Sequence, residues 1–143
     1  MKSAVLALAV VLGLAGAAAA AAAGEAKVDF AKDVQPIFKA SCVKCHGVDP
    51  KNPKSRPAGK LRLDDKAAAM KGGRSGAVII PGDAKDSLLF KLLNGPVPRP
   101  DKNENKDIPP MPKAKRGQKW KPLSAQQIDV IRRWIDQGAN WPG

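Results

Sequence analysis

Apolar side chains recur every three or four positions in three stretches of the chain, which is the spacing of one face of an α-helix. The first stretch covers about residues 29–41, with Asp29 as the N-cap and Pro36 as a candidate kink. The second covers about residues 84–93, with Asp83 as the cap. Their apolar stripes are Phe30, Val34, Ile37 and Phe38 in the first stretch and Leu88, Leu89, Leu92 and Leu93 in the second.

The third stretch has the clearest start and stop signals. Ser124 and Gln127 form an S-x-x-Q capping box, in which each residue satisfies a backbone N–H of the other. Gly138 follows the last turn, where glycine commonly ends a helix. The apolar stripe between these signals is Ile128, Ile131, Trp134 and Ile135.

A weaker fourth helix is predicted over about residues 64–70, ending at the Gly72–Gly73 pair. The only run with strand character, residues 77–80, is too short and isolated to build a sheet, and the sequence contains no internal repeat. The pattern therefore predicts a small all-α fold of three to four helices joined by long Pro/Gly/Lys loops.

The N-terminus differs in composition from the rest of the chain. A basic residue, Lys2, precedes an apolar run at residues 4–14 and an alanine block at residues 17–23, an order typical of secretory leaders. We therefore interpret residues 1–23 as a signal peptide and residues 24–143 as an exported domain, located in the bacterial periplasm. An uncleaved membrane-spanning helix is the alternative, since the segment after Lys2 carries no charge and is about long enough to cross a bilayer.

Removal of this leader changes the composition. The 143-residue chain has a formal net charge of +12 and 43% hydrophobic residues. Without the leader and its single charge, Lys2, the remaining 120 residues carry +11 and only about 35% hydrophobic residues, which is low for a globular domain. Because small domains with so thin a core commonly recruit a metal, a disulfide or a cofactor, we expect a bound group to fill the middle of the fold.

The segment Cys42-Val43-Lys44-Cys45-His46, at the end of the first predicted helix, is a C-x-x-C-H motif, the pattern of c-type haem attachment. Two thiols three positions apart on one helical turn reach both vinyl groups of one porphyrin edge, and the adjacent imidazole binds the iron. The motif predicts one covalently attached haem c. Cys42 and Cys45 are the predicted thioether anchors, and His46 is the predicted proximal iron ligand.

Two other uses of C-x-x-C compete with haem attachment. A dithiol or disulfide suits an exported protein, but thioredoxin-like redox chemistry needs a βαβ pattern that this sequence lacks. A structural zinc site needs four ligands, whereas the chain has two cysteines and one histidine. The sequence therefore favours haem, and a non-haem dithiol oxidoreductase stays open as an alternative.

Because His46 is the only histidine, the chain cannot supply a second histidine ligand to the iron. Outside the leader, only Met70 and Met111 offer a thioether; Lys, the N-terminal amine, water or an open position are the other candidates. Met111 lies among three prolines, Pro109, Pro110 and Pro112, which fix φ and stiffen the segment. Met70 follows three alanines on a predicted helix, where methionine is usually packing filler. We expect Met111 as the distal ligand, with Met70 or an open sixth position as alternatives.

Further short segments accompany the motif: F-A-K-D-V-Q-P-I at 30–37, G-K-L-R-L-D at 59–64, K-G-G at 71–73, I-P-G-D at 80–83, S-L-L at 87–89 and W-I-D-Q-G-A-N-W-P at 134–142. With these segments the chain resembles class I c-type cytochrome domains, most closely the version common in planctomycete-type bacteria. The resemblance implies a cytochrome c-like fold whose first and last helices cross beside the haem, with Met111 on the far face from His46. Such domains usually carry M-P-P at the methionine loop, whereas this chain has P-P-M-P-K at 109–113.

Directly after Met111 comes a basic tract, residues 113–121, which contains no acid. Its basic residues are Lys113, Lys115, Arg116, Lys119 and Lys121. We expect the tract to steer an acidic redox-partner protein onto the exposed haem edge, although a solvated loop is the plainer explanation. Nucleic acid is not expected as a partner of an exported protein without a recognisable binding module. Membrane association is expected only through an uncleaved leader or through surface charge.

Helical spacing places Trp134 in the core, whereas the sequence leaves the positions of Trp120 and Trp141 undecided. Together these observations predict an exported monohaem cytochrome c domain, residues 24–143, that carries single electrons through His/Met-ligated iron. We expect no catalytic residue and no enzymatic activity, since the sequence shows no nucleophile–base pair and no second metal site. A five-coordinate haem domain that binds or senses a ligand is the alternative function.

Overall fold

The computed structural model of the chain describes residues 25–99 and 107–142, so the predicted signal peptide, residues 1–23, lies outside the described residues. Within the described ranges the backbone is helical or irregular, and its strand-like pairings are isolated bridges. Its helices are η1 (Phe30–Val34, a π-helix), α1 (Gln35–Ser41), η2 (Ala58–Lys60, a 3₁₀-helix), α2 (Lys66–Lys71), α3 (Leu88–Asn94) and α4 (Ala125–Asp136). The prediction of an all-α fold is confirmed for this part of the chain.

The first helical stretch begins at the predicted cap. The Asp29 carboxylate accepts the N–H of Lys32 at 2.9 Å. The chain leaves the π-helix at Gln35, whose N–H donates to the Phe30 carbonyl, and continues as α-helix. Because Pro36 has no N–H to donate, the hydrogen-bond ladder changes register here without losing a donor. The feature observed at Pro36 is therefore a change of helix type.

Helix α3 begins four residues later than the sequence predicted. The Asp83 side chain caps a separate turn, accepting the N–H of Asp86 at 2.9 Å. The hydroxyl of Ser87 instead donates to the Asp83 carbonyl at 2.7 Å and accepts the N–H of Ile80 at 2.8 Å. These contacts hold Ser87 in an extended conformation, φ −66° and ψ 120°, so the helix starts at Leu88. The predicted start near residue 84 was wrong for this reason.

The other two helices start and stop close to the predicted positions. The capping box at α4 is confirmed: the Ser124 hydroxyl accepts the Gln127 N–H, and the Gln127 side chain accepts the Ser124 N–H. Helix α2 is capped by Asp65, whose carboxylate accepts the Ala68 N–H at 2.8 Å. It ends at Gly72, where φ is 84°, a left-handed conformation that glycine adopts without strain.

The core joins the first helical stretch to the last. Helix α4 packs against both η1 and α3. The Phe30 ring stacks on Trp141 at 4.1 Å between centroids, and Phe38 meets Trp134 edge-on at 5.8 Å. Trp134 is 1% exposed, which confirms its predicted place in the core, and Trp141 joins the same aromatic cluster. Such ring pairs add about 0.5–1.5 kcal/mol each beyond the area they bury.

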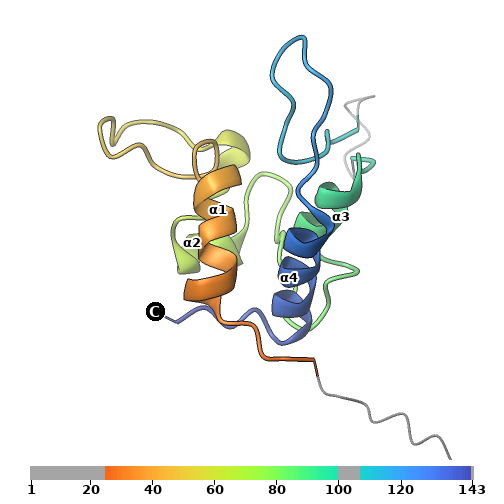
Figure 1. Cartoon of the computed structure of the whole chain (residues 1–143). Coiled ribbons are helices and arrows are strands. Elements are labelled where there is room, and N and C mark those ends of the chain that lie inside the picture. Colours follow the sequence, from red (N-terminus) through yellow and green to blue (C-terminus); the bar gives the residue numbers. More distant parts are fainter. Residues whose placement is uncertain (1–24, 100–106, 143) are drawn as a thin grey trace, which may run out of the picture.

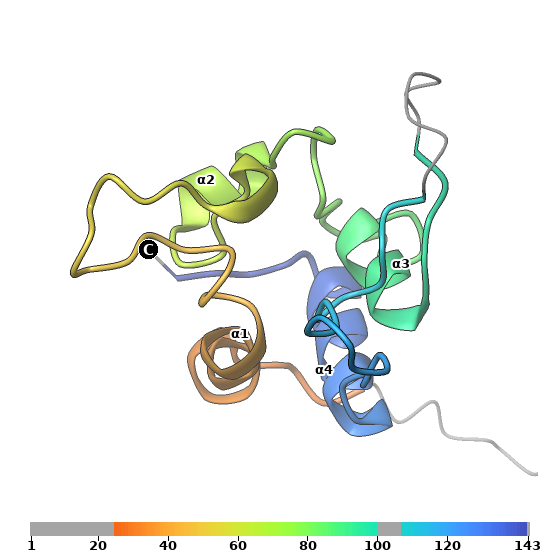
Figure 2. The same ribbon diagram turned by 90° about the horizontal axis from the view of Figure 1, so that it is seen from above.

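In both views α1 and α2 lie on one side of the molecule, and α3 and α4 lie on the other (Figures 1 and 2). The turn that follows α1 and the segment 107–123 that precedes α4 lie at the same end, facing each other across the middle of the molecule. Over residues 25–99 and 107–142, no helix has the length and apolar character needed to cross a membrane.

Ser87 gives a direct test of the buried hydrogen bonds that start α3. We expect Ser87→Ala to lower the free energy of unfolding by about 1–3 kcal/mol, because the Ile80 N–H and the Asp83 carbonyl both lose their bond to the hydroxyl of a fully buried side chain. Urea denaturation followed by circular dichroism measures this change. The matched control is Ser75→Ala on the exposed surface, which should change stability by less than about 0.5 kcal/mol. Equal unfolding midpoints for the two variants would show that the hydrogen bonds of the Ser87 hydroxyl do not stabilise the fold.

Candidate functional site

The C-x-x-C-H turn continues directly from the end of α1. The N–H groups of Cys42 and Val43 both donate to the Phe38 carbonyl at 2.9 Å and close the helix. The Cys42 carbonyl then accepts the N–H groups of Cys45 and His46, at 3.1 and 2.8 Å. All three predicted site residues of the motif therefore lie on one compact backbone turn. Cys42 is buried, Cys45 is exposed, and both thiols are free.

His46 is held by the segment 58–63, which folds back over this turn. Its Nδ1 lies 3.0 Å from the Ala58 carbonyl oxygen, and because a carbonyl only accepts, Nδ1 is the protonated nitrogen. The backbone adds two bonds, from the Ala58 N–H to the Cys45 carbonyl at 2.8 Å and from the Leu63 N–H to the His46 carbonyl at 2.7 Å. In the neutral imidazole, Nε2 therefore keeps its lone pair, which is the state in which an imidazole binds a metal ion.

Two residues beyond the motif shape this turn, and sequence reasoning assigned neither a role. Gly47 is buried, and a Cβ at this position would lie 2.6 Å from the Val43 carbonyl oxygen, so only glycine fits. The Asp64 carboxylate accepts the Val48 N–H at 3.1 Å and pairs with Arg62 at 3.0 Å. The Arg62 hydrogen bond lowers the pKa of the Asp64 carboxyl. A glycine directly after the motif and an arginine two positions before an aspartate were the only signals in the sequence.

The two thiols differ in environment. Cys42 is 9% exposed, and burial raises the pKa of its thiol from 9.0 to about 11, with the nearby Cys45 adding to the effect. At neutral pH Cys42 is therefore protonated. Because the thiolate is the reactive form of cysteine, the apoprotein has an inert thiol at Cys42 and a solvent-accessible one at Cys45.

The two methionines outside the leader lie in different surroundings. The Met111 N–H donates to the Leu92 carbonyl at 2.8 Å, which ties the methionine loop to α3. Val97 and Ile108 exchange both of their backbone hydrogen bonds, at 3.0 and 2.8 Å, and so fix the chain just before the methionine loop. Met111 itself is partly exposed, whereas Met70 on α2 packs against the hydrophobic core.

Trp120, whose position the sequence left undecided, carries the one buried side-chain nitrogen or oxygen in the described ranges that has no hydrogen-bond partner. A buried N–H without an acceptor costs about 1–3 kcal/mol. A haem propionate is an acceptor of the required kind, and the basic side chains around Trp120 favour an anion there. The two free thiols, the Nε2 lone pair of His46 and the Trp120 N–H are together the groups that a covalently attached haem c needs.

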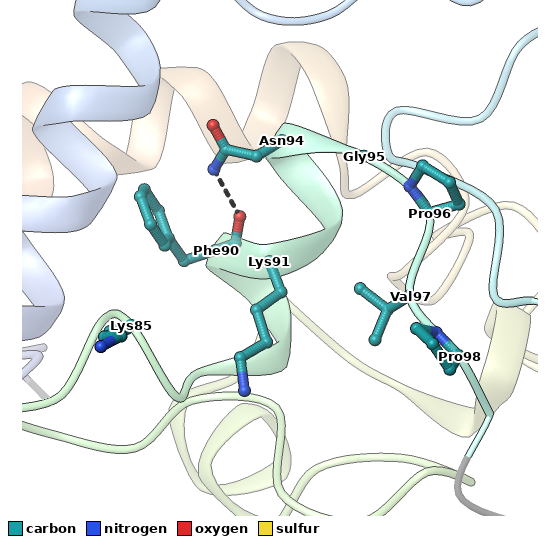
Figure 3. Close-up of a pocket in the computed structure, with 8 residues that line it drawn as sticks. All are labelled: Lys85, Phe90, Lys91, Asn94, Gly95, Pro96, Val97 and Pro98. Carbon is teal, nitrogen blue, oxygen red and sulfur yellow. Dashed lines mark hydrogen bonds between the residues drawn. The ribbon is translucent and has the colours of Figure 1, made fainter.

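A pocket of about 480 Å³ beside the C-terminal half of α3 contains none of the predicted site residues. Its lining includes Phe90, Lys91 and Pro96, and the Asn94 side chain donates to the Phe90 carbonyl at 2.9 Å (Figure 3). Among residues 25–99 and 107–142, no group of three or more His, Cys, Asp or Glu side chains is placed to hold a metal ion. The candidate site is therefore the turn after α1 together with the segments that surround it.

A helical fold with a C-x-x-C-H turn and a braced histidine is typical of c-type cytochromes, which hold haem covalently. The model of the Planctomycete cytochrome C family matches residues 42–100, and this match confirms the resemblance seen in the sequence. The match begins at Cys42 and ends before Met111. Comparison with curated proteins and with solved structures gives no significant match.

The difference between the two thiols is testable in the reduced apoprotein. We expect a maleimide reagent at pH 7 to modify Cys45 at least tenfold faster than Cys42, because Cys42 is buried and its pKa is raised to about 11. Peptide mass spectrometry after timed quenching measures both rates. In 6 M urea the two rates should converge, and equal rates in the folded protein would contradict the described burial.

Proposed function

We propose that this protein is an exported monohaem cytochrome c that carries single electrons between redox partners in the bacterial periplasm. Cys42 and Cys45 anchor the haem through thioethers, and His46 is the proximal ligand. The observation that carries this proposal is the hydrogen bond from His46 Nδ1 to the Ala58 carbonyl, which leaves Nε2 free for iron. A haem bound there supplies one-electron chemistry, alternating between ferric and ferrous iron.

We assign Met111 as the distal ligand. Its backbone is tied to α3 through Leu92, and three prolines restrict φ on both sides of it. A ligand held in this way moves little when the iron changes oxidation state, and small movement favours fast electron transfer. A thioether paired with a neutral imidazole also favours the ferrous state and gives a fairly positive potential for a haem.

In this proposal the protein is a carrier with no catalytic residue of its own. If His46 and Met111 both held the iron of a bound haem, that iron would have no open place for a substrate. The partner is proposed to be an acidic protein that docks near the basic tract. The tract's five basic side chains are all exposed, and no ion pair links them to a carboxylate among the described residues: Lys113, Lys115, Arg116, Lys119 and Lys121.

The ligand assignment is tested by Met111→Leu, with Met70→Leu as the matched control. Both changes remove a thioether and conserve volume. In protein matured in a host that attaches haem, Met111→Leu should abolish the thioether-to-ferric charge-transfer band. It should also lower the reduction potential by on the order of 0.1 V, within the range of about 0.8 V that axial ligands span. Met70→Leu should keep both properties.

Three results would contradict parts of this proposal. Loss of the band only in Met70→Leu would make Met70 the ligand. High-spin wild-type iron that binds carbon monoxide rapidly would favour the five-coordinate ligand-binding alternative. Absence of any c-type reduced spectrum would leave the dithiol oxidoreductase as the better explanation of Cys42 and Cys45.

Trp120 provides an independent check on the haem environment. If its indole N–H donates to a propionate, that proton should exchange slowly with D₂O in the holoprotein and fast in the apoprotein, as measured by ¹⁵N NMR. Trp120→Phe should destabilise the holoprotein by about 1–3 kcal/mol more than the apoprotein, because only the holoprotein loses the hydrogen bond. Equal destabilisation of both forms would show that Trp120 does not contact the haem.

A further inference from the structure

A second group of unpaired basic side chains lies beside the C-x-x-C-H turn, outside the tract that the sequence singled out. Lys44 lies within the motif, and the other members lie on the loop of residues 47–57, here called the proximal loop. All are exposed and none forms an ion pair with a described carboxylate: Lys44, Lys51, Lys54 and Arg56. The only acid of the proximal loop, Asp49, turns a carboxylate oxygen toward the Lys51 N–H at 2.9 Å. The loop is therefore strongly positive.

The proximal loop is ordered by its own hydrogen bonds. The Asp49 N–H donates to the Ser55 hydroxyl at 3.0 Å, and the Asn52 N–H donates to the Asp49 carbonyl at 3.0 Å. At the end of the loop, the Ala58 N–H donates to the Cys45 carbonyl at 2.8 Å. Because these bonds fix the backbone, the basic side chains project from a defined surface, and a partner loses little entropy in ordering them.

The base of the proximal loop is concave. A pocket of about 500 Å³ lies there, with Cys45 in its wall, and it combines apolar side chains with two cationic ones. The apolar side chains are Val43, Val48 and Pro50, and the cationic ones are Lys44 and Arg56. This combination suits the methylene stem and carboxylate of an acidic side chain. A group seated in the pocket lies next to the proposed anchor residue Cys45.

The proximal loop and the loop that carries the basic tract project from the same end of the molecule (Figure 1). Seen from above, the proximal loop lies on the side of α1 and α2, whereas the loop that carries the basic tract lies over α4 (Figure 2). The four basic side chains at the proximal loop and the five of the basic tract thus make this end of the molecule cationic.

We propose that an acidic redox-partner protein docks across both loops at once and inserts a carboxylate side chain into the pocket beside Cys45. This proposal rests on the proposed carrier function and names the surface that function uses. A protein with a protruding acidic side chain fits better than an anionic bilayer, because a flat surface touches loop tips while the pocket lies at the base of the loop. Potentials of opposite sign also raise the rate of encounter by tenfold or more at low salt.

The test uses the ferric holoprotein and, as probe, fully reduced flavodoxin, an acidic one-electron donor. One electron passes from the flavin hydroquinone to the ferric iron, which leaves flavin semiquinone and ferrous iron. Stopped-flow rates are compared for Lys51→Glu/Arg56→Glu in the proximal loop, Lys113→Glu/Lys115→Glu in the basic tract, and Lys66→Glu/Lys71→Glu on α2. The three pairs change the net charge equally, so the last is the matched control.

We expect the proximal-loop and tract pairs to reduce the second-order rate about tenfold each at low ionic strength, and at least threefold more than the control pair. The differences should disappear in 0.5 M salt, where exposed charges are screened within a few ångströms. Unchanged spectra and reduction potentials in all variants establish that the haem site is intact.

Each contrary result has a distinct meaning. A loss confined to the tract pair overturns the two-loop proposal and leaves a carrier that docks on the tract alone. Equal losses in all three pairs show a net-charge effect and overturn any defined surface. Rates unaffected by variants and salt, with co-sedimentation on phosphatidylglycerol vesicles that both loop pairs abolish, replace the protein partner with a membrane. Failure of the wild-type iron to accept an electron contradicts the carrier function itself.

Discussion

The hydrogen bond between His46 Nδ1 and the Ala58 carbonyl is the constraint on which the site depends, because it decides which imidazole nitrogen is left for a metal. The acceptor is in place only because the chain reverses at Gly59, where φ is +61°. A hydrogen bond from another segment of the chain stabilises this reversal: the Gly59 carbonyl accepts the Arg74 N–H at 2.7 Å. Gly73 must lack a side chain, since a Cβ there would lie 2.5 Å from the same carbonyl oxygen. A glycine-rich segment far from the motif in sequence therefore fixes the orientation of the histidine.

The core and the site share one residue, Phe38. Its ring packs edge-on against Trp134 and Trp141 in the cluster that joins the first helical stretch to α4. Its carbonyl closes α1 by accepting the N–H groups of Cys42 and Val43. The aromatic packing thus positions the end of the helix that carries the first thiol. In a chain with few apolar residues, one small core therefore both stabilises the fold and fixes the position of the C-x-x-C-H turn.

The charges are divided by location. On α4, Arg132 pairs with Glu25, Asp129 and Asp136 at 2.9–3.0 Å, and these bonds also hold the N-terminal segment of the domain against the helix. The basic side chains of the proximal loop and the basic tract have no carboxylate partner among the described residues. Paired charges contribute little to the long-range field, whereas unpaired ones of one sign add up. The excess positive charge of the chain is therefore expressed mainly at the end where the thiols lie.

The sequence by itself determined the features that depend on neighbours a few positions apart. The C-x-x-C-H turn, the Asp29 cap and the Ser124–Gln127 capping box are of this kind, because their geometry follows from one turn of backbone. Tertiary structure decided what depends on distant contacts. The Ser87 hydroxyl bonds back to Ile80 and Asp83 and delays α3, the Trp141 ring finds Phe30 across more than a hundred residues, and the Ala58 carbonyl meets His46. Periodicity carries no information about which distant groups a folded chain brings within hydrogen-bonding or stacking distance, and that is why the bracing of the histidine and the second basic loop emerged only from the fold.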